Sequence, residues 1–232
     1  MTPSAARPLL AALRLGLLAL LALPVAAQQD KKDFSPAERL LFMTNQLTTL
    51  KPPTVLRYSF RKSGSMEEGF EDSVTISLSK QPDGSCCAGV GEFLTGTRKL
   101  NLPEVPAAEG NPVILYFLEH DVREMQRLTK GSQYHFRKRI RMAVYQAATV
   151  REVALAFRGK TIKGTEVNIS PYLDDPNRPR YEKLAGKQYV FTLSDAVPGG
   201  VYGIRTQIAE ASQAPLIVEE LYAEGAEPAP RK

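Results

Sequence analysis

The stretch from Phe117 to Met142, FLEHDVREMQRLTKGSQYHFRKRIRM, contains both histidines of the chain, several carboxylates and the densest run of basic residues. Within it His120 and Glu124 stand four residues apart, a spacing that suits two metal ligands, or a histidine base oriented by a carboxylate. The same spacing is typical of charged pairs on a solvated helix face, each contributing roughly 0.2–0.5 kcal/mol. The solvated face is the favoured interpretation, because a metal or catalytic site needs further partners.

The sequence does not supply those partners. On a helical wheel His120 falls opposite the apolar stripe that includes Leu118 and Val122. His135, the second histidine, belongs to the next predicted helix and projects away from its apolar side. The chain has no GxSxG elbow and no HExxH motif. We therefore expect no metal site, no cofactor and no enzymatic activity.

Three acidic residues are predicted to be structural. Asp121 lies at the edge of the apolar stripe, where a partly buried carboxylate needs a cation, and an arginine of the following helix could supply it. The alternative is an ordinary surface aspartate. Asp174 and Asp175 precede a proline in LDDPNRPR, which indicates turn chemistry rather than a calcium loop.

The basic run FRKRIR is the other conspicuous feature of this stretch. Such runs on helices are usually solvated, but a cationic helix face can also contact anionic lipid headgroups or an acidic partner protein. The candidate contact residues are Arg137, Lys138, Arg139 and Arg141.

The first 27 residues have the pattern of a secretory signal peptide. Arginines precede the short apolar core LGLLALLAL, and Val25 and Ala27 occupy the third and first positions before a predicted cut ahead of Gln28. No cysteine follows the cut to take a lipid anchor, and no later stretch is apolar over the roughly 20 residues of a membrane span. We expect an exported, periplasmic protein without a transmembrane span.

The composition of the remaining chain limits its class. Without Arg7 and Arg14 of the leader, the formal net charge falls from +5 to about +3, which is too small to indicate a nucleic-acid binder. Residues 28–222 are enough for one domain with its own core. The last residues, 223–232, carry little apolar surface and are predicted to be a disordered tail.

The two cysteines, Cys86 and Cys87, are adjacent in a predicted strand, where neighbouring side chains point to opposite faces. A disulfide between neighbours would be strained, so we expect two unpaired thiols; a redox or intermolecular role is the alternative. They do not form a CxxC motif, which argues against a thioredoxin-like or zinc site.

The hydrophobic periodicity predicts the fold class. A capping box at Ser35–Glu38 starts a helix that ends before the prolines at 52–53. Alternating strands follow to about Phe93, then two helices over 111–129 and 133–148, and then alternating strands again. Such alternation indicates strands with one solvated face. The prediction is an α+β fold with a curved, half-barrel-like antiparallel sheet of about seven to nine strands and helices packed on one face.

The leading helix, the strand VLRYSF and the helix opening GNPVILYFL in mid-chain resemble, in order and pattern, the periplasmic lipoprotein carriers of the LolA type. In that family an open half-barrel holds a hydrophobic ligand under a helical lid. The resemblance implies a carrier for lipid or lipidated protein. The Arg-Pro-x-x-Phe segment of those carriers is absent here, and KGSQYHFRKRIRMAVYQAA adds a helix without a counterpart in them.

The one-sided sheet and its helical cover could enclose either a ligand cavity or a filled core, since apolar alternation fits both. The cavity candidates are Leu56, Tyr58, Phe60, Val74, Ile76, Leu78, Ile114, Phe117, Leu118, Tyr189, Phe191 and Leu193. The predicted function is a periplasmic carrier or chaperone for an amphiphile whose tail lies among these residues. The alternative is a non-enzymatic envelope interaction protein with a filled core and an unknown partner.

Overall fold

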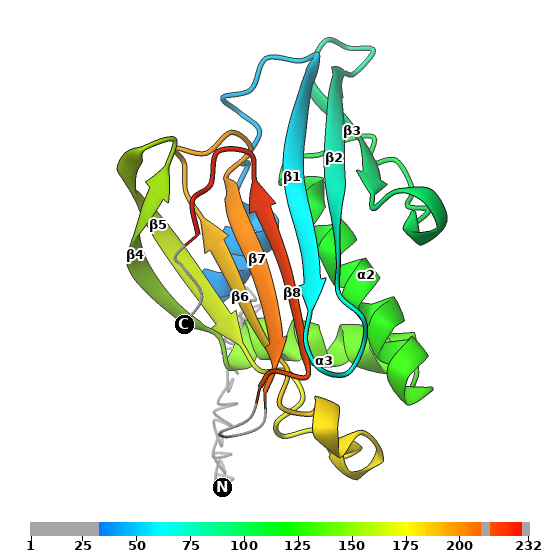
Figure 1. The fold of residues 1–232 in the computed structure, drawn as a ribbon. Coiled ribbons are helices and arrows are strands. Elements are labelled where there is room, and N and C mark those ends of the chain that lie inside the picture. Colours follow the sequence, from blue (N-terminus) through cyan, green and yellow to red (C-terminus); the bar gives the residue numbers. More distant parts are fainter. Residues whose placement is uncertain (1–32, 210–213, 229–232) are drawn as a thin grey trace, which may run out of the picture. The chain divides into compact units, whose positions relative to one another are not determined.

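The fold is seen in a computed structural model that describes residues 33–209 and 214–228. A single antiparallel sheet of eight strands runs in the order β3-β2-β1-β8-β7-β6-β5-β4, with the helices behind it (Figure 1). The residues from Phe34 onward group into one compact unit. The predicted α+β class with an open, curved antiparallel sheet is confirmed. The predicted signal peptide, residues 1–27, lies outside the described residues.

The strands follow the predicted alternation of apolar and polar residues. In β1 the side chains of Leu56, Tyr58 and Phe60 are buried, whereas Arg57 and Ser59 between them are exposed. β1 pairs with β2 on one side and with β8 on the other, which joins the first and last parts of the domain. The strands are β1 (Thr54–Ser63), β2 (Phe70–Lys80), β3 (Cys86–Phe93), β4 (Thr149–Phe157), β5 (Lys160–Ile169), β6 (Gln188–Leu193), β7 (Val201–Ile208) and β8 (Ile217–Ala223).

The two long helices, α2 (Pro112–Thr129) and α3 (Gln133–Gln146), begin and end close to the predicted positions. The Asn111 side chain caps α2 by accepting a hydrogen bond from the Val113 amide at 3.1 Å. The helix ends at Lys130, which adopts the left-handed conformation with φ of 58°. No helix of the described ranges is long and apolar enough to cross a membrane.

The first helical segment is shorter than predicted. The capping box is present, with the Glu38 amide donating to Ser35 Oγ at 3.1 Å and the Ser35 amide donating to Glu38 Oε2 at 2.9 Å. The segment consists of α1 (Pro36–Glu38) and a π-helical turn, Arg39–Met43, and it ends there. Thr44 Oγ1 then donates to the Arg39 carbonyl, and Asn45 Oδ1 accepts from the Leu47 amide. The Thr44 amide still donates to the Arg39 carbonyl, but the Leu47 amide bonds to the Asn45 side chain instead of a carbonyl one turn earlier, so the helix does not continue.

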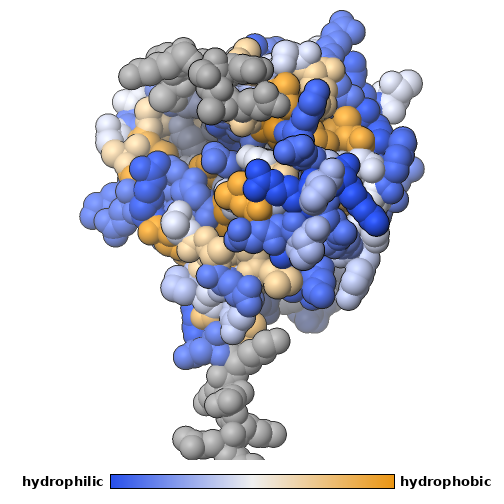
Figure 2. Space-filling view, turned by 90° about the horizontal axis from the view of Figure 1, so that it is seen from below, coloured by the Kyte–Doolittle hydropathy of each residue, from blue (hydrophilic) through white to orange (hydrophobic). Residues whose placement is uncertain are grey.

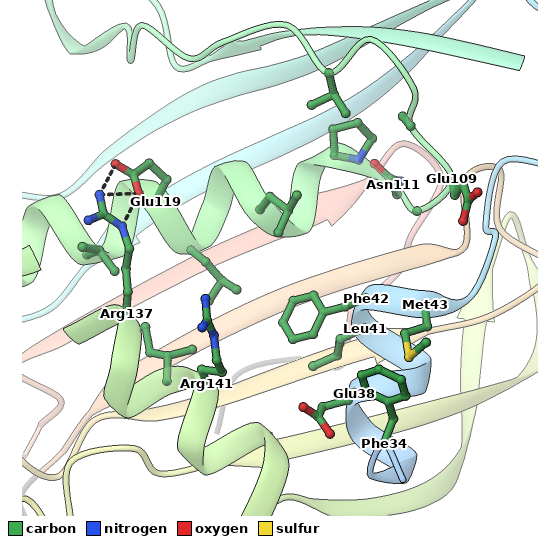
Figure 3. A pocket seen from close by; sticks show the side chains of 18 of the residues that line it. Phe34, Glu38, Leu41, Phe42, Met43, Glu109, Asn111, Glu119, Arg137 and Arg141 are labelled. Carbon is green, nitrogen blue, oxygen red and sulfur yellow. Dashed lines mark hydrogen bonds and ion pairs between the residues drawn. The ribbon is translucent and has the colours of Figure 1, made fainter. Parts of the chain in front are cut away.

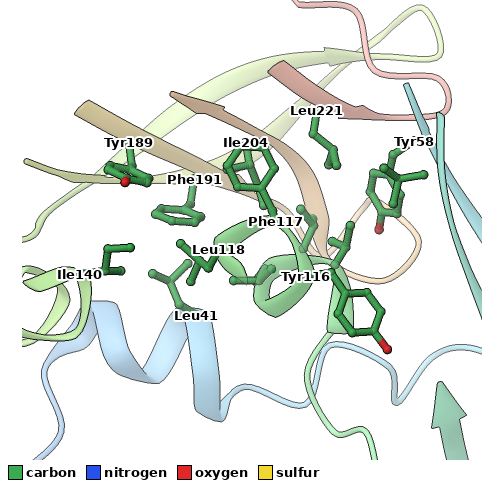
Figure 4. Packing of buried hydrophobic residues seen from close by; sticks show 14 of the residues in the cluster. Leu41, Tyr58, Tyr116, Phe117, Leu118, Ile140, Tyr189, Phe191, Ile204 and Leu221 are labelled. Atoms are coloured by element: carbon green, nitrogen blue, oxygen red, sulfur yellow. The ribbon is translucent and has the colours of Figure 1, made fainter. Parts of the chain in front are cut away.

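The core lies between the sheet and the helices. Tyr189 and Phe191 of β6 and Ile204 of β7 point from the sheet toward Phe117 and Leu118 of α2 (Figure 4). All five are at most 9% exposed and belong to one cluster of buried apolar residues. Helix α2 is therefore fixed to the sheet along its apolar side, which leaves its other sides to form surface features.

The start of the predicted disordered tail is ordered, which corrects that prediction. Ala223 ends β8, the Glu224 amide donates to the Arg57 carbonyl at 2.9 Å, and the Glu227 amide donates to the Ala156 carbonyl at 3.1 Å. The composition predicted disorder because the segment has little apolar surface, but backbone pairing with neighbouring strands holds it in place.

The cysteine prediction is also wrong. The structure joins Cys86 and Cys87 in a disulfide, across a cis peptide bond, at the start of β3. The prediction assumed a regular trans strand, in which the two side chains would point to opposite faces and could not meet.

Candidate functional site

A concave surface of the described residues is a groove on the helical side of the molecule. Its walls are the first helical segment, the loop of residues 105–111, and the facing sides of α2 and α3 (Figure 3). Its volume of about 680 Å³ lies within the range of roughly 300–1,000 Å³ that is typical of small-molecule sites. We call it the helical groove.

The helical groove has an exposed apolar wall. Phe34, Phe42 and Met43 are 44%, 38% and 46% exposed, and Leu115 of α2 is 52% exposed. All four line the groove. Large apolar side chains that gather on a concave surface, rather than being scattered singly, mark a binding site for an apolar group.

The local structure explains why these side chains face solvent. Leu41 points into the core at 3% exposure and anchors the first segment, and the Ser35 hydroxyl donates to the Val144 carbonyl of α3 at 3.1 Å. The π-helical turn after Glu38 then presents Phe42 and Met43 on the surface next to Leu41. The side of the segment that faces the core is thus anchored, while the side that faces the groove is apolar and exposed.

Charged side chains border this apolar wall. Arg137 donates to both carboxylate oxygens of Glu119, with distances of 2.9 to 3.1 Å, and Arg123 donates to the same carboxylate at 3.0 Å. Burial acts to raise the pKa of Glu119, but the hydrogen bonds from Arg137 and Arg123 outweigh it and lower the pKa below its usual value. Arg141, one turn after Arg137, also lines the groove.

The structure separates the four predicted headgroup contacts into two groups. Arg137 and Arg141 line the helical groove. Arg139 turns away from it and donates to the Pro171 carbonyl at 2.9 Å, while Lys138 is exposed on α3. A contact of these residues with a headgroup stays a prediction. Arg137 and Arg141 are the two whose position in the groove would allow such a contact.

The twelve predicted cavity residues all lie in the cluster of buried apolar residues between sheet and helices. Leu118 also lines the helical groove. The role of the twelve in ligand binding stays a prediction. Phe34, Phe42, Met43 and Leu115 were not predicted as site residues from the sequence. Two features of the sequence could have indicated them. The leading helix has apolar residues on more than one side, and α2 has an apolar residue outside its buried stripe.

A network of buried charged side chains lies between α2 and the sheet. Asp121, which is fully buried, accepts hydrogen bonds from Lys187, the residue just before β6, and from the Tyr189 hydroxyl. Burial acts to lower the pKa of Lys187, but the charges of Asp121 and Glu219 outweigh it and raise the pKa. The prediction that Asp121 needs a cation is correct, but the partner is Lys187 rather than an arginine of α3.

His120 belongs to the same network, and its predicted place on the solvated face is wrong. Its side chain is 10% exposed, lies edge-on to Phe60 with ring centroids 5.5 Å apart, and places Nε2 3.3 Å from Glu219 Oε1. The wheel put His120 opposite the apolar stripe, but the sheet curves around α2 far enough to cover this position. The carboxylate of Glu219 in β8, which is 1% exposed, is the polar partner of the buried imidazole.

The network extends to the surface through β1 and the end of α2. Lys62 donates to Glu67 at 2.7 Å and to Glu124 at 2.9 Å, and Arg127 bridges the same two carboxylates. Burial raises the pKa of Glu124, but the hydrogen bonds from Arg127 and Lys62 lower it to about 2. Both elements end at the lower end of Figure 1, and Figure 2, seen from that side, shows many hydrophilic side chains with apolar patches between them.

The second histidine forms a separate, smaller cluster. His135 Nε2 lies 2.6 Å from Asp175 Oδ2, and the Tyr181 hydroxyl and Arg139 approach the same carboxylate. Asp175 also accepts from the Asn177 amide at 2.8 Å, which is the predicted turn chemistry. This cluster ties α3 to the loop before β6. Within residues 33–209 and 214–228, no group of three or more His, Cys, Asp or Glu side chains is placed to hold a metal ion.

Comparisons with known proteins give little further information. The sequence matches no protein-family model and none of the curated proteins. Among solved structures, the crystal structure of the Mycobacterium tuberculosis lipoprotein LppX is similar with a TM-score of 0.32 and 8% identity, over 77% of this chain and 90% of that chain. The resemblance to LolA-type carriers in element order stays a prediction.

Proposed function

We propose that the protein is an exported, non-enzymatic binding protein that carries an amphiphile, a lipid or a lipidated protein, with the apolar tail in the helical groove. The observation that carries the proposal is the set of four exposed apolar side chains, Phe34, Phe42, Met43 and Leu115, on one concave surface. A chain with a complete core of its own has no structural need to expose them together.

The helical groove, rather than the interior, is the proposed place of the tail. Tyr58, Phe60 and Phe191 are at most 3% exposed and pack with their neighbours, so a ligand there would have to displace core side chains. A tail in the groove meets side chains that are already at the surface. Each methylene that it buries contributes about 0.8 kcal/mol, so about eight methylenes would contribute roughly 6 kcal/mol before the cost of association.

A charge placed on the groove wall tests this proposal. Titration of the mature chain with a fluorescent fatty acid, 11-(dansylamino)undecanoic acid, is expected to show saturable binding without detergent. Leu115→Asp is expected to weaken binding at least tenfold, because it puts a carboxylate where the tail lies. The matched control is Val90→Asp in β3, where the valine is 48% exposed and outside the groove. Equal loss in both variants, or no saturable binding, contradicts the proposal.

A protein partner is the second candidate, and the edge strand β4 favours it. β4 ends the sheet, and six of its nine residues are exposed. Residues 226–227 pair with the last two residues of β4, Ala156 and Phe157. The rest of this edge can pair with an extended segment of another chain. Cross-links from a photoreactive residue at Val150 to an envelope protein, together with an empty groove, would support this candidate over the carrier.

A further inference from the structure

The two arginines that α3 contributes to the helical groove differ in their partners. Arg137 is held by Glu119, whose carboxylate accepts from Nε and Nη2 on one side of the guanidinium. Arg141 is exposed, extends from α3 toward α2 between Arg137 and Phe42, and has no hydrogen bond or ion pair with any residue that the structure describes (Figure 3). Within the described part of the chain, one cation beside the apolar wall therefore has no partner, and a second is engaged by an acid on the same rim.

The groove lining also holds three glutamates, but none of them forms an ion pair with Arg141 among the residues that the structure describes. Glu38 is engaged in the capping box, where its carboxylate accepts from the Ser35 amide at 2.9 Å. Glu109 lies beside Asn111, at the opposite end of the groove from Arg137 (Figure 3). The end of the groove near α3 is the place where an anionic group would find a partner.

Resting on the proposed function, we infer that the helical groove selects anionic amphiphiles. Arg141 binds the phosphate or carboxylate of the headgroup, and Glu119 competes with the headgroup for Arg137. An arginine suits this task because its planar guanidinium forms two parallel hydrogen bonds to a phosphate or carboxylate. The apolar tail then lies along Leu115 and Phe42, next to the bound headgroup.

The role of Glu119 gives the inference a distinctive consequence. If Glu119 is an internal competitor, its removal frees Arg137 and adds a second cation for the headgroup. Glu119→Gln is then expected to strengthen the binding of an anionic lipid, whereas a purely structural role for the Arg137–Glu119 pair predicts weaker binding or none.

Two lysophospholipids with the same acyl chain provide the test. Oleoyl-lysophosphatidylglycerol is anionic and oleoyl-lysophosphatidylcholine is zwitterionic, and their affinities for the full mature chain are measured by calorimetry below their micellar concentrations. The unaltered chain is expected to bind the anionic lipid about tenfold more tightly. Arg141→Gln is expected to remove most of this preference, and Glu119→Gln to increase it about threefold. The control Arg180→Gln makes the same change at an exposed arginine outside the groove.

The outcomes separate this inference from the proposed function. Equal affinity for both lipids, with no effect of Arg141→Gln, overturns the charge selectivity and leaves a groove that binds tails. Equal weakening of both lipids by Arg141→Gln also overturns it, because the arginine would then act only as part of the wall. If neither lipid binds, the selectivity and the proposed function both fail. A preference that persists at 1 M salt contradicts a role for an exposed cation, since salt screens such contacts.

Discussion

The buried charges under α2 are held by one lysine between two carboxylates. Lys187, 2% exposed, contacts Asp121 and lies 3.7 Å from Glu219. Charges this deep are tolerated because each has a partner of opposite sign and further hydrogen bonds. The arrangement fixes how α2 sits on the sheet, and α2 is one wall of the helical groove.

Removal of the lysine alone is expected to be severe. Lys187→Met leaves Asp121 and Glu219 buried without their shared cation and should lower the free energy of unfolding by about 3–5 kcal/mol. Replacing Asp121 as well, in Asp121→Leu with Lys187→Met, should cost less than the single change. Lys183→Met, at an exposed lysine, is the control. Urea unfolding measures all three, and a double variant as unstable as the single one would contradict the pairing.

Acid should weaken the outer part of the same network. The pKa of Glu124 is lowered to about 2 in the folded chain, because Arg127 and Lys62 offset its burial. A lowered pKa gives stability that is present above the usual value near 4.5 and is lost as pH falls toward 2. Unfolding free energies between pH 6 and pH 2.5 should therefore fall less steeply in Glu124→Gln than in the unaltered chain. A variant at an exposed acid, Glu182→Gln, should keep the original slope.

At the residue level, the sequence indicated that a buried charge requires a partner more reliably than it indicated which residue the partner is. The edge position of Asp121 on the apolar stripe correctly indicated a carboxylate that needs a cation. Its partner lies 66 residues later in the chain. No local spacing predicts such a pairing, and an arginine on the next helix was the nearer choice. His120 was misplaced for a similar reason, since the wheel shows one helix and not how far a sheet curves around it.

The helical elements position the groove, and their ends were predictable where capping side chains mark them. Asn111 and Pro112 start α2 and Lys130 ends it, as the sequence indicated. The leading helix was predicted to run to the prolines at 52–53 but stops at Met43. Short polar residues after it can bond either to side chains or to the helix, and composition does not decide between them.

Asn111 holds the start of α2 to the rest of the domain. It is 2% exposed, caps α2, and donates to the Tyr58 hydroxyl at 2.7 Å and to the Gly199 carbonyl at 2.8 Å. Asn111→Ala removes the cap and leaves buried polar groups without a partner, so it should lower the free energy of unfolding by about 2–3 kcal/mol. Asn101→Ala, at an exposed asparagine, should change it by less than about 0.5 kcal/mol. Chemical unfolding that gives equal values for the two variants would refute this role.

For the molecule as a whole, the sheet was predictable and the groove was not. Alternation in β1, β2 and β6 indicated which side chains are buried and that the sheet is antiparallel, but not that β8 pairs with β1. The helical groove is made by exposed residues of three separate helical segments, such as Phe42 and Leu115, which meet only after the helices pack. Periodicity indicates which residues leave the solvent, but not which exposed residues come together.

The most direct measurement is the site of attachment of a photoreactive fatty acid. The full mature chain would be irradiated with a palmitate analogue that carries a diazirine near the end of its tail, and the labelled peptides would be identified by mass spectrometry. We predict label on residues 34–43 and 112–122, abolished by excess palmitate and by Leu115→Asp. Label on the sheet interior at 188–193, or label that palmitate does not displace, would contradict a tail-binding site in the helical groove.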